Sequence, residues 1–227
     1  MSAVCYPVVE LRQYTLRPGQ RDVLIDLFDR DLVESQETAG MAIVGQFRDL
    51  DDPDRFVWIR GFASMPARAQ ANATMIDSDN VLLLRPVTAR SDFPAPSGGR
   101  LPVGHSPAGP SRILVTLYHR DQPFDQAFAD FFDGQARPAL IETGATPLAC
   151  LQTEHAENTF PALPVRTGEN VFVWLARFPS DAHLDGHLRQ LERSGRWQDR
   201  VLPALSALIA GRPQRLRLAP TARSLLR

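Results

Sequence analysis

The sequence contains no lysine: all 25 basic residues among its 227 are arginine. This absence excludes Schiff-base catalysis, attachment of pyridoxal phosphate and the lysine of a phosphate-binding loop. A GC-rich genome favours arginine codons and explains the bias without a functional cause, because both residues serve on protein surfaces.

Cysteine is also scarce, the net charge is close to zero, and long apolar runs are absent. With only Cys5 and Cys150, a disulfide framework is not expected. A formal net charge of −1 gives no general affinity for nucleic acid or an anionic membrane. The sequence has neither an 18-residue apolar run nor a signal-peptide pattern at its beginning. Since 44% of residues are hydrophobic, we expect a folded cytoplasmic protein that binds neither nucleic acid nor membrane.

An ordered internal repeat is the main feature of what is present. Matching segments, in chain order, are Leu11–Tyr14 with Val115–Tyr118, Thr38–Gly40 with Glu142–Gly144, and Phe56–Ser64 with Phe172–Ser180. The residue numbers of the third pair of segments differ by more than those of the first two pairs. We therefore expect an insertion in the second half, at Ala156–Gly168. We therefore predict a first half at 1–92, a Pro/Gly-rich linker at 93–111 and a second half at 112–227.

Each half is predicted to follow the order β-α-β-β-α-β, which is the ferredoxin-like plait. Predicted elements of the first half are Val8–Leu16, a helix from Val23 to Leu32, Ile43–Arg48, Arg55–Phe62, a helix from Met65 to Asp77 capped by Ser64, and Val81–Val87. Those of the second half are Arg112–His119, Phe124–Thr143, Leu148–Glu154, Asn170–Phe178, Asp181–Arg193, an extra helix Trp197–Ala210, and Gln214–Leu218. Two such α+β halves can pair their bare sheet faces and close a dimeric α/β barrel.

Strand parity divides the side chains into two kinds. Val9 and Leu11 point to one face of their strand, and Glu10, Arg12 and Tyr14 point to the other. On a later strand, Val57 and Ile59 oppose the mixed set Phe56, Trp58, Arg60 and Phe62. We expect the aliphatic faces to pack on the helices and the mixed faces to line the barrel.

The segment Glu10–Gly19 resembles the opening of the NIPSNAP domain, and Phe56–Ala71, with Ser64 and Arg68, looks like its second block. The ending Leu216–Leu226 is similar to that of bacterial tandem members. The resemblance implies the dimeric α/β barrel fold and little chemistry. Related barrels include cofactor-free monooxygenases, isomerases and haem enzymes, so fold alone does not select a reaction.

The best candidate site is the mixed face. We predict catalytic roles for Tyr14 and Arg60, and substrate-binding roles for Glu10, Arg12, Trp58, Tyr118 and Trp174. An arginine can bind a carboxylate or enolate, and a tyrosine can donate to a developing oxyanion. The alternative is that Glu10 pairs with the arginines and only holds the strands together. The halves differ here, because Thr116 replaces Arg12 and Ala176 replaces Arg60.

Other polar residues favour ordinary structural roles. His183 and His187 lie one helical turn apart, a spacing that can hold zinc, but no third ligand with matching spacing is apparent. His119 ends a strand, on the face opposite Tyr118, and could relay protons or bind haem. His155 is expected to be exposed. Cys150 is expected to be an inert buried thiol on the barrel face. We predict neither a metal nor another cofactor.

Two functions remain open. The first is an enzyme that acts on a small aromatic or apolar acid or ketone by proton transfer or cofactor-free oxygenation. The second is a non-catalytic binding or scaffold protein with a filled barrel, as the recruitment roles of eukaryotic NIPSNAP relatives imply. A solvent-reachable barrel cavity above about 300 Å³ with convergent polar groups would favour the enzyme. A homodimer beyond the intrachain barrel stays open.

Overall fold

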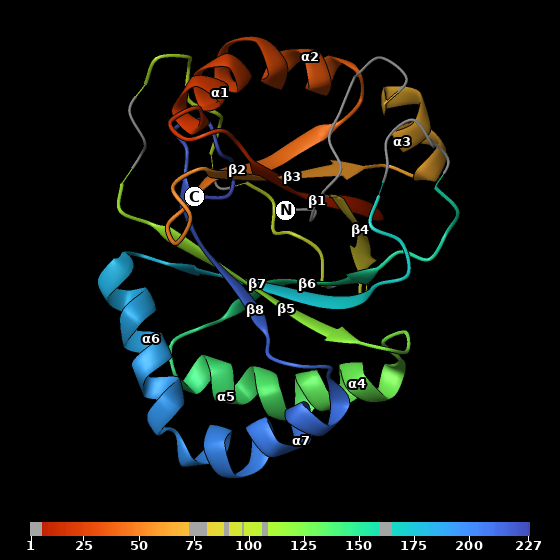
Figure 1. The fold of residues 1–227 in the computed structure, drawn as a ribbon, viewed down its shortest axis with the longest axis vertical. Coiled ribbons are helices and arrows are strands. Elements are labelled where there is room, and N and C mark those ends of the chain that lie inside the picture. The colour runs from red at the N-terminus through yellow and green to blue at the C-terminus, as the bar shows by residue number, and fades with distance from the viewer. Residues whose placement is uncertain (1–5, 73–80, 89–90, 97, 106–108, 159–164) are drawn as a thin grey trace.

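A computed structural model describes residues 6–72, 81–88, 91–96, 98–105, 109–158 and 165–227. Its strands are β1 (Val8–Thr15), β2 (Ala42–Asp49), β3 (Arg55–Phe62), β4 (Val81–Pro86), β5 (Arg112–Arg120), β6 (Pro147–Thr153), β7 (Asn170–Phe178) and β8 (Gln214–Pro220). They close a barrel in the order β1-β3-β2-β8-β5-β7-β6-β4 (Figure 1).

The barrel is two four-stranded sheets joined at both edges. The first sheet has the order β4-β1-β3-β2 and the second the order β8-β5-β7-β6. Phe47 of β2 pairs with Pro220 of β8, and Leu84 of β4 pairs with Thr153 of β6. Each sheet thus covers the edges that the other would expose to solvent. The predicted pair of ferredoxin-like halves in a dimeric α/β barrel is confirmed.

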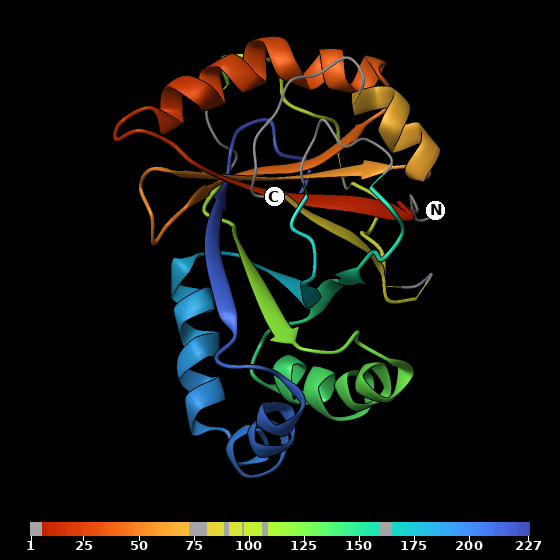
Figure 2. The same cartoon turned by 45° about the vertical axis from the view of Figure 1, so that its right-hand side comes forward.

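Helices cover the outer face of each sheet (Figures 1 and 2). Over the first sheet lie α1 (Arg21–Leu27), the π-helical turn η1 (Phe28–Leu32), α2 (Val33–Thr38) and α3 (Met65–Asn72). Over the second lie α4 (Gln126–Phe131), η2 (Phe132–Ala136), α5 (Arg137–Glu142), α6 (Asp181–Arg193), η3 (Trp197–Val201) and α7 (Leu202–Leu208). In the described segments, no helix is long and apolar enough to cross a bilayer.

The bounds of three elements were predicted correctly at both ends. Arg55–Phe62, Asn170–Phe178 and Asp181–Arg193 have the predicted bounds. The long helix expected at Phe124–Thr143 is instead interrupted by the π-helical turn η2, which hydrophobic spacing does not reveal. The helix expected to start at Met65 is seen as far as Asn72, and the rest of its predicted range lies outside the described residues.

The interior of the barrel is apolar and mainly aliphatic, and our assignment of the two strand faces was wrong. One buried cluster draws side chains from every strand of the barrel, including Val9, Leu11, Val57 and Ile59. The mixed faces, with Trp58 among them, point outward beneath the helices. An eight-stranded barrel has room only for the side chains that fill it. Charged side chains there would lack the polar partners that helices can supply.

Candidate functional site

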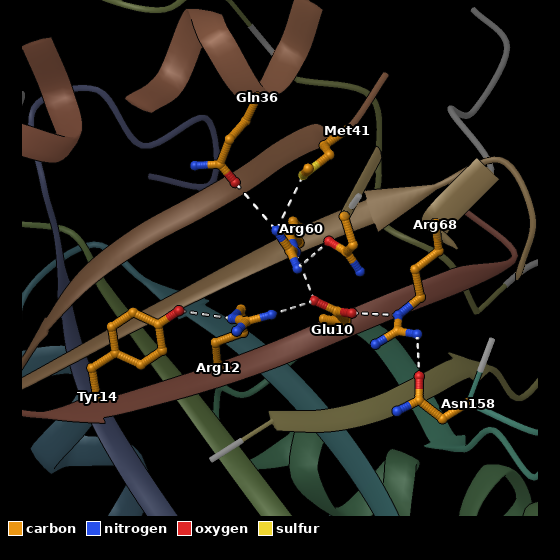
Figure 3. A network of polar contacts seen from close by, with 9 residues as sticks. Glu10, Arg12, Tyr14, Gln36, Met41, Arg60, Arg68 and Asn158 are labelled. Atoms are coloured by element: carbon orange, nitrogen blue, oxygen red, sulfur yellow. Dashed lines mark hydrogen bonds and ion pairs between the residues drawn. The ribbon is translucent and has the colours of Figure 1, made fainter. Parts of the chain in front are cut away.

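Glu10 lies at the buried centre of a polar network between the first sheet and its helices (Figure 3). Its Oε2 accepts hydrogen bonds from Arg12 Nη1 at 2.7 Å and from Arg60 Nε at 2.6 Å. Its Oε1 accepts one from Arg68 Nε at 2.5 Å. Glu10, Arg12, Arg60 and Arg68 are each 0% exposed. The structure therefore brings the predicted charged residues together, beneath the helices and not inside the barrel.

The network keeps Glu10 ionised. Burial alone raises the pKa of this carboxyl, but the charges of Arg60, Arg12 and Arg68 and the hydrogen bond from Arg60 outweigh it and lower the pKa to about 2. Such a carboxylate is a poor proton acceptor at neutral pH, because an effective general base has a pKa near the working pH. Glu10 therefore positions the arginines and does not act as a base.

Arg60 makes contacts on all of its donor nitrogens. Besides Glu10, its Nη1 contacts Gln36 Oε1 of α2 at 3.4 Å and Met41 Sδ at 3.1 Å. Its Nη2 donates to Asn72 Oδ1 of α3 at 2.8 Å. Arg60 thus links β3 to α2 and α3. The sequence supplied this residue as a catalytic candidate, and its contacts favour a positioning role.

Arg12 and half-buried Tyr14 extend the network along β1. Arg12 Nε donates to Tyr14 Oη at 2.9 Å. The guanidinium carbon atoms of Arg12 and Arg60 lie 5.2 and 5.1 Å from the centre of the Trp58 ring. An indole face stabilises a cation at this separation, most strongly in a site without water. The Trp58 ring therefore packs against the guanidinium groups of both Arg12 and Arg60.

Arg68 and Asn72 of α3 complete the site, and sequence reasoning did not select them. Ser64 caps α3, since its Oγ accepts from Ala67 N at 3.2 Å. The spacing of four residues then places Arg68 and Asn72 on one helix face. This spacing, after a strand carrying a charge on its outer face, is the signal that could have found them.

Three buried donors of this site have no hydrogen-bond acceptor among the described residues: Trp58 Nε1, Arg68 Nη2 and Asn72 Nδ2. Most buried donors in proteins are paired, because an unpaired one costs about 1–3 kcal/mol. All three orphaned groups are donors, so the described residues supply fewer acceptors than donors here. A guest that supplies oxygen atoms, above all an oxyanion, matches this deficit.

In the second half, uncharged residues occupy the strand positions that correspond to Glu10, Arg12 and Arg60. Arg12 pairs with Trp58 across β1 and β3, and Thr116 pairs with Trp174 across β5 and β7. The Glu10–Arg60 pair corresponds in register to Leu114–Ala176. Leu184 follows Ser180 by four residues, as Arg68 follows Ser64, and it is fully buried. A half of this barrel therefore packs well with apolar residues at these positions.

The tyrosine and tryptophan predicted in the second half lie in an aromatic core. Trp174 Nε1 donates to Tyr118 Oη at 2.9 Å, and both side chains are buried. Burial raises the pKa of Tyr118 to about 12, although the hydrogen bond from Trp174 and the charge of Arg215 lower it. Tyr118 and Trp174 therefore contact each other beneath the opposite helices, and the structure does not bring them to Glu10.

A polar cavity of about 230 Å³ adjoins the Glu10 network. It is lined by Leu83, Thr153–Ala156, Asn158 and Val165–Asn170. Asn158 connects the two, because its Oδ1 also accepts from Arg68 Nη1 at 2.8 Å. A molecule in this cavity is therefore separated from the Arg68 guanidinium by one amide side chain.

His119, His183, His187 and the buried cysteine do not join this site. His183 is exposed and its Nδ1 contacts Ser180 Oγ, whereas His187 is buried and bonded to the Thr143 carbonyl oxygen. His119 is the second-last residue of β5 and is half-buried, with its Nδ1 3.8 Å from Glu169 Oε2. Within the described segments, no group of three or more His, Cys, Asp and Glu could hold a metal ion.

Cys150 was expected on the barrel face and lies on the helix side instead. It is buried in the aromatic core of the second half, where Arg137 Nη2 contacts its Sγ at 3.3 Å. Burial raises the pKa of the thiol to about 11 despite the nearby arginine. The correction has the same origin as that for β1 and β3, because only one row of each strand faces the barrel.

Comparison with known proteins places the fold and not the chemistry. No protein-family profile and no curated protein sequence matches this chain. An anthrone oxidase-like protein superposes with a TM-score of 0.62 and 14% identity, covering 94% of this chain and 91% of that one. A monooxygenase-like protein from Fusobacterium nucleatum superposes with a TM-score of 0.58 and 9% identity, covering 96% and 93%.

A NIPSNAP family protein from Agrobacterium tumefaciens is also similar, with 16% identity, a TM-score of 0.41 and coverage of 52% of this chain and 99% of that one. Its likeness is thus to half of the chain and is distant. At these identities the comparisons establish a shared architecture alone. The chain has the fold of the ferredoxin-like dimeric α/β barrels to which monooxygenase-like proteins also belong.

Proposed function

We propose that the protein binds a small aromatic or apolar acid, or an enolisable ketone, at the buried arginine network of its first half. The observation that carries the proposal is the set of orphaned donors on Trp58, Arg68 and Asn72. The apolar second half supports it, because the fold does not need these charges for packing. Buried charges that packing does not require are costly and are typical of functional sites.

Arg68 is the residue best placed to bind the acid. Its Nε is held by Glu10, while Nη1 meets Asn158 and Nη2 has no acceptor in the described part of the chain. A carboxylate that replaced the Asn158 side chain would meet Nη1 and Nη2 together, in the bidentate geometry that guanidinium favours. Arg60 and Glu10 would position Arg68 and Asn72, and Arg12 would hold the Tyr14 hydroxyl.

The proposed reaction is stabilisation of an enolate, followed by proton transfer or by cofactor-free oxygenation. Guanidinium groups in a site without water favour the anion that forms when a ketone loses its α-proton. With dioxygen as the oxidant, a methylene group R₂CH₂ becomes R₂C=O, and the second oxygen atom leaves as water with the two hydrogens. Tyr14 as the phenolate, whose oxygen accepts a hydrogen bond from Arg12 Nε, is the candidate acceptor of this α-proton, since Glu10 is too acidic and arginine stays protonated.

The resemblance of Glu10–Gly19 to NIPSNAP domains leads us to place the chain, as a tandem of two such domains, near that family. The fold-level likeness to monooxygenase-like and anthrone oxidase-like proteins is compatible with oxygenation. It does not discriminate between reactions, so the test must address binding first.

Thermal melts of the parent and of Arg68→Met with a panel of aromatic carboxylates test the proposal. We expect carboxylates to raise the melting temperature of the parent. Since a hydrogen bond to a charged group contributes about 1.5–3 kcal/mol, affinity should fall roughly tenfold or more in Arg68→Met. Asn158→Asp should also abolish binding, because its carboxylate would occupy Arg68. Arg85→Met, at an exposed position of β4, is the matched control. Equal ligand shifts in the parent and Arg68→Met would contradict the proposal.

A binding or scaffold protein with a filled barrel is the second candidate. Two observations favour it: aliphatic side chains fill the barrel, and Glu10 accepts hydrogen bonds from three arginines. This candidate predicts that no carboxylate shifts the melting temperature of the parent by more than it shifts that of Arg68→Met. Oxygen consumption with anthrone as the probe then separates a catalyst from a binding protein, provided that carboxylates do bind.

A further inference from the structure

One mouth of the barrel holds a cavity that is distinct from the Glu10 network. Its volume is about 190 Å³. Its walls are Tyr6, Val44, Phe93–Pro96, Leu148, Arg177 and Leu225–Arg227. They therefore come from the segment before β1, from three strands, from the segment between the halves and from the C-terminal residues. We call this space the mouth cavity.

The walls of the mouth cavity are fixed by contacts between distant segments. Leu226 N donates to the Val44 carbonyl oxygen at 3.0 Å, which holds the last residues against β2. Tyr6 N donates to the Asp92 carboxylate, which also accepts from Phe93 N at 2.7 Å. These bonds tie the Tyr6 and Phe93 walls together, so the cavity is part of the folded structure.

Gly61 makes room for the Tyr6 wall. A Cβ atom at Gly61 would lie 2.4 Å from Tyr6 Cγ, far inside van der Waals contact. Gly61 follows Val57 and Ile59 on the row of β3 that faces the barrel. The missing side chain therefore lets an aromatic ring lie over the end of the barrel.

Arg177 places a positive charge at the rim of an otherwise apolar space. It continues the barrel-facing row of β7, where Val171, Val173 and Leu175 are buried, and it is exposed at the end of that row. It forms no salt bridge in the described part of the chain. Arg227, the other charged lining residue, donates to the carbonyl oxygens of Gly99 and Ala222. The lining thus has cations and no carboxylate side chain.

We infer that the mouth cavity binds a small monocarboxylic acid with one aromatic ring or a short branched chain. The apolar walls would enclose the hydrocarbon part, and Arg177 would bind the carboxylate at the rim. The size agrees, because an apolar cavity of about 150 Å³ is known to accept benzene. A carboxylate on such a ring extends toward solvent, where the guanidinium lies.

The test uses 4-fluorobenzoate and its neutral counterpart 4-fluorobenzyl alcohol, with fluorine NMR titrations. Because Arg177 is exposed, we expect the acid to bind only about fivefold more tightly than the alcohol, equivalent to about 1 kcal/mol. Arg177→Met should remove this preference and leave the affinity for the alcohol unchanged. Leu148→Trp should fill the cavity and abolish binding of both probes. Arg193→Met, at an exposed position of α6, should change neither.

Each titration is repeated in an Arg68→Met background, which removes the proposed site in the Glu10 network and keeps the two proposals separate. Leu225→Trp replaces Leu148→Trp if that variant does not fold, as judged by circular dichroism. The inference is overturned by absence of binding of both probes at about 10 mM, far weaker than a specific site. A fivefold preference that persists in Arg177→Met, or undiminished binding in the filled variants, overturns it equally.

Discussion

At the scale of single residues, Glu10 determines how the first half responds to acid. Three guanidinium groups surround its carboxylate, and its pKa is lowered to about 2 although burial opposes this. Because the folded pKa lies below the unfolded value of 4.5, ionised Glu10 stabilises the folded state above that value. This contribution is lost as the pH falls from about 4.5 toward 2.

We predict that this one group contributes roughly 3 kcal/mol at neutral pH, since each pKa unit corresponds to about 1.4 kcal/mol. Urea denaturation of the parent and of Glu10→Gln at pH 6 and pH 3 measures it. The free energy of unfolding of the parent should fall by about 2 kcal/mol more than that of the variant. Parallel losses in both proteins would show that Glu10 is not the responsible group.

At the scale of elements, His187 joins α6 to the end of α5. Its Nδ1 donates to the Thr143 carbonyl oxygen at 3.0 Å, and its ring lies 5.4 Å from that of Phe178. Burial lowers the pKa of His187, the hydrogen bond to Thr143 raises it, and the charge of Arg215 lowers it. The net direction is down, so the neutral ring is favoured in the folded state.

Acid should therefore loosen this contact. A folded pKa below the unfolded value of about 6.5 gives stability that is present above pH 6.5 and is lost as the pH falls below it. We expect the parent to lose more unfolding free energy between pH 7.5 and 5.5 than His187→Leu does. His183→Ala, one turn away and exposed, should retain the loss seen in the parent. A parent whose stability is flat over this range would exclude His187 as the titrating link.

At the scale of the whole molecule, the two halves bury different residues at equivalent positions between sheet and helices. The first half buries Glu10 among arginines, and the second half uses Leu114 and Ala176 at the corresponding strand positions. Replacing a complete buried ionic group by apolar residues is often neutral or stabilising by about 1–4 kcal/mol. Removing one partner alone is strongly destabilising, because it leaves buried charges unpaired.

We predict that a graft of the second half's residues into the first half still folds. It combines five substitutions: Glu10→Leu, Arg12→Thr, Arg60→Ala, Arg68→Leu and Asn72→Leu. Its unfolding free energy should equal or exceed that of the parent, whereas Glu10→Leu alone should lose roughly 3–5 kcal/mol. Urea denaturation compares the three proteins. A graft as unstable as the single variant would mean that the charges are structural, and the proposed binding site would lose its main support.

The sequence by itself determined the order of elements, the pairing of two ferredoxin-like halves and the separation of charged from aliphatic rows on β1 and β3. These follow from the period of two along a strand and from the predicted internal repeat, both of which can be read from the order of residues alone. It also selected Glu10, Arg12 and Arg60, because three charged residues at alternate strand positions are conspicuous.

Only the tertiary structure decided which row faces the barrel. The alternation of side chains along a strand shows which residues share a face. It does not show which of the two faces lies inside the barrel. The choice depends on partners far along the chain: Gln36, Arg68 and Asn72 reach the charged row from two helices, and other strands supply the aliphatic side chains that fill the barrel. The mouth cavity likewise arises where residues distant in sequence meet. Such convergence depends on distances across the fold, which hydrophobic periodicity does not contain.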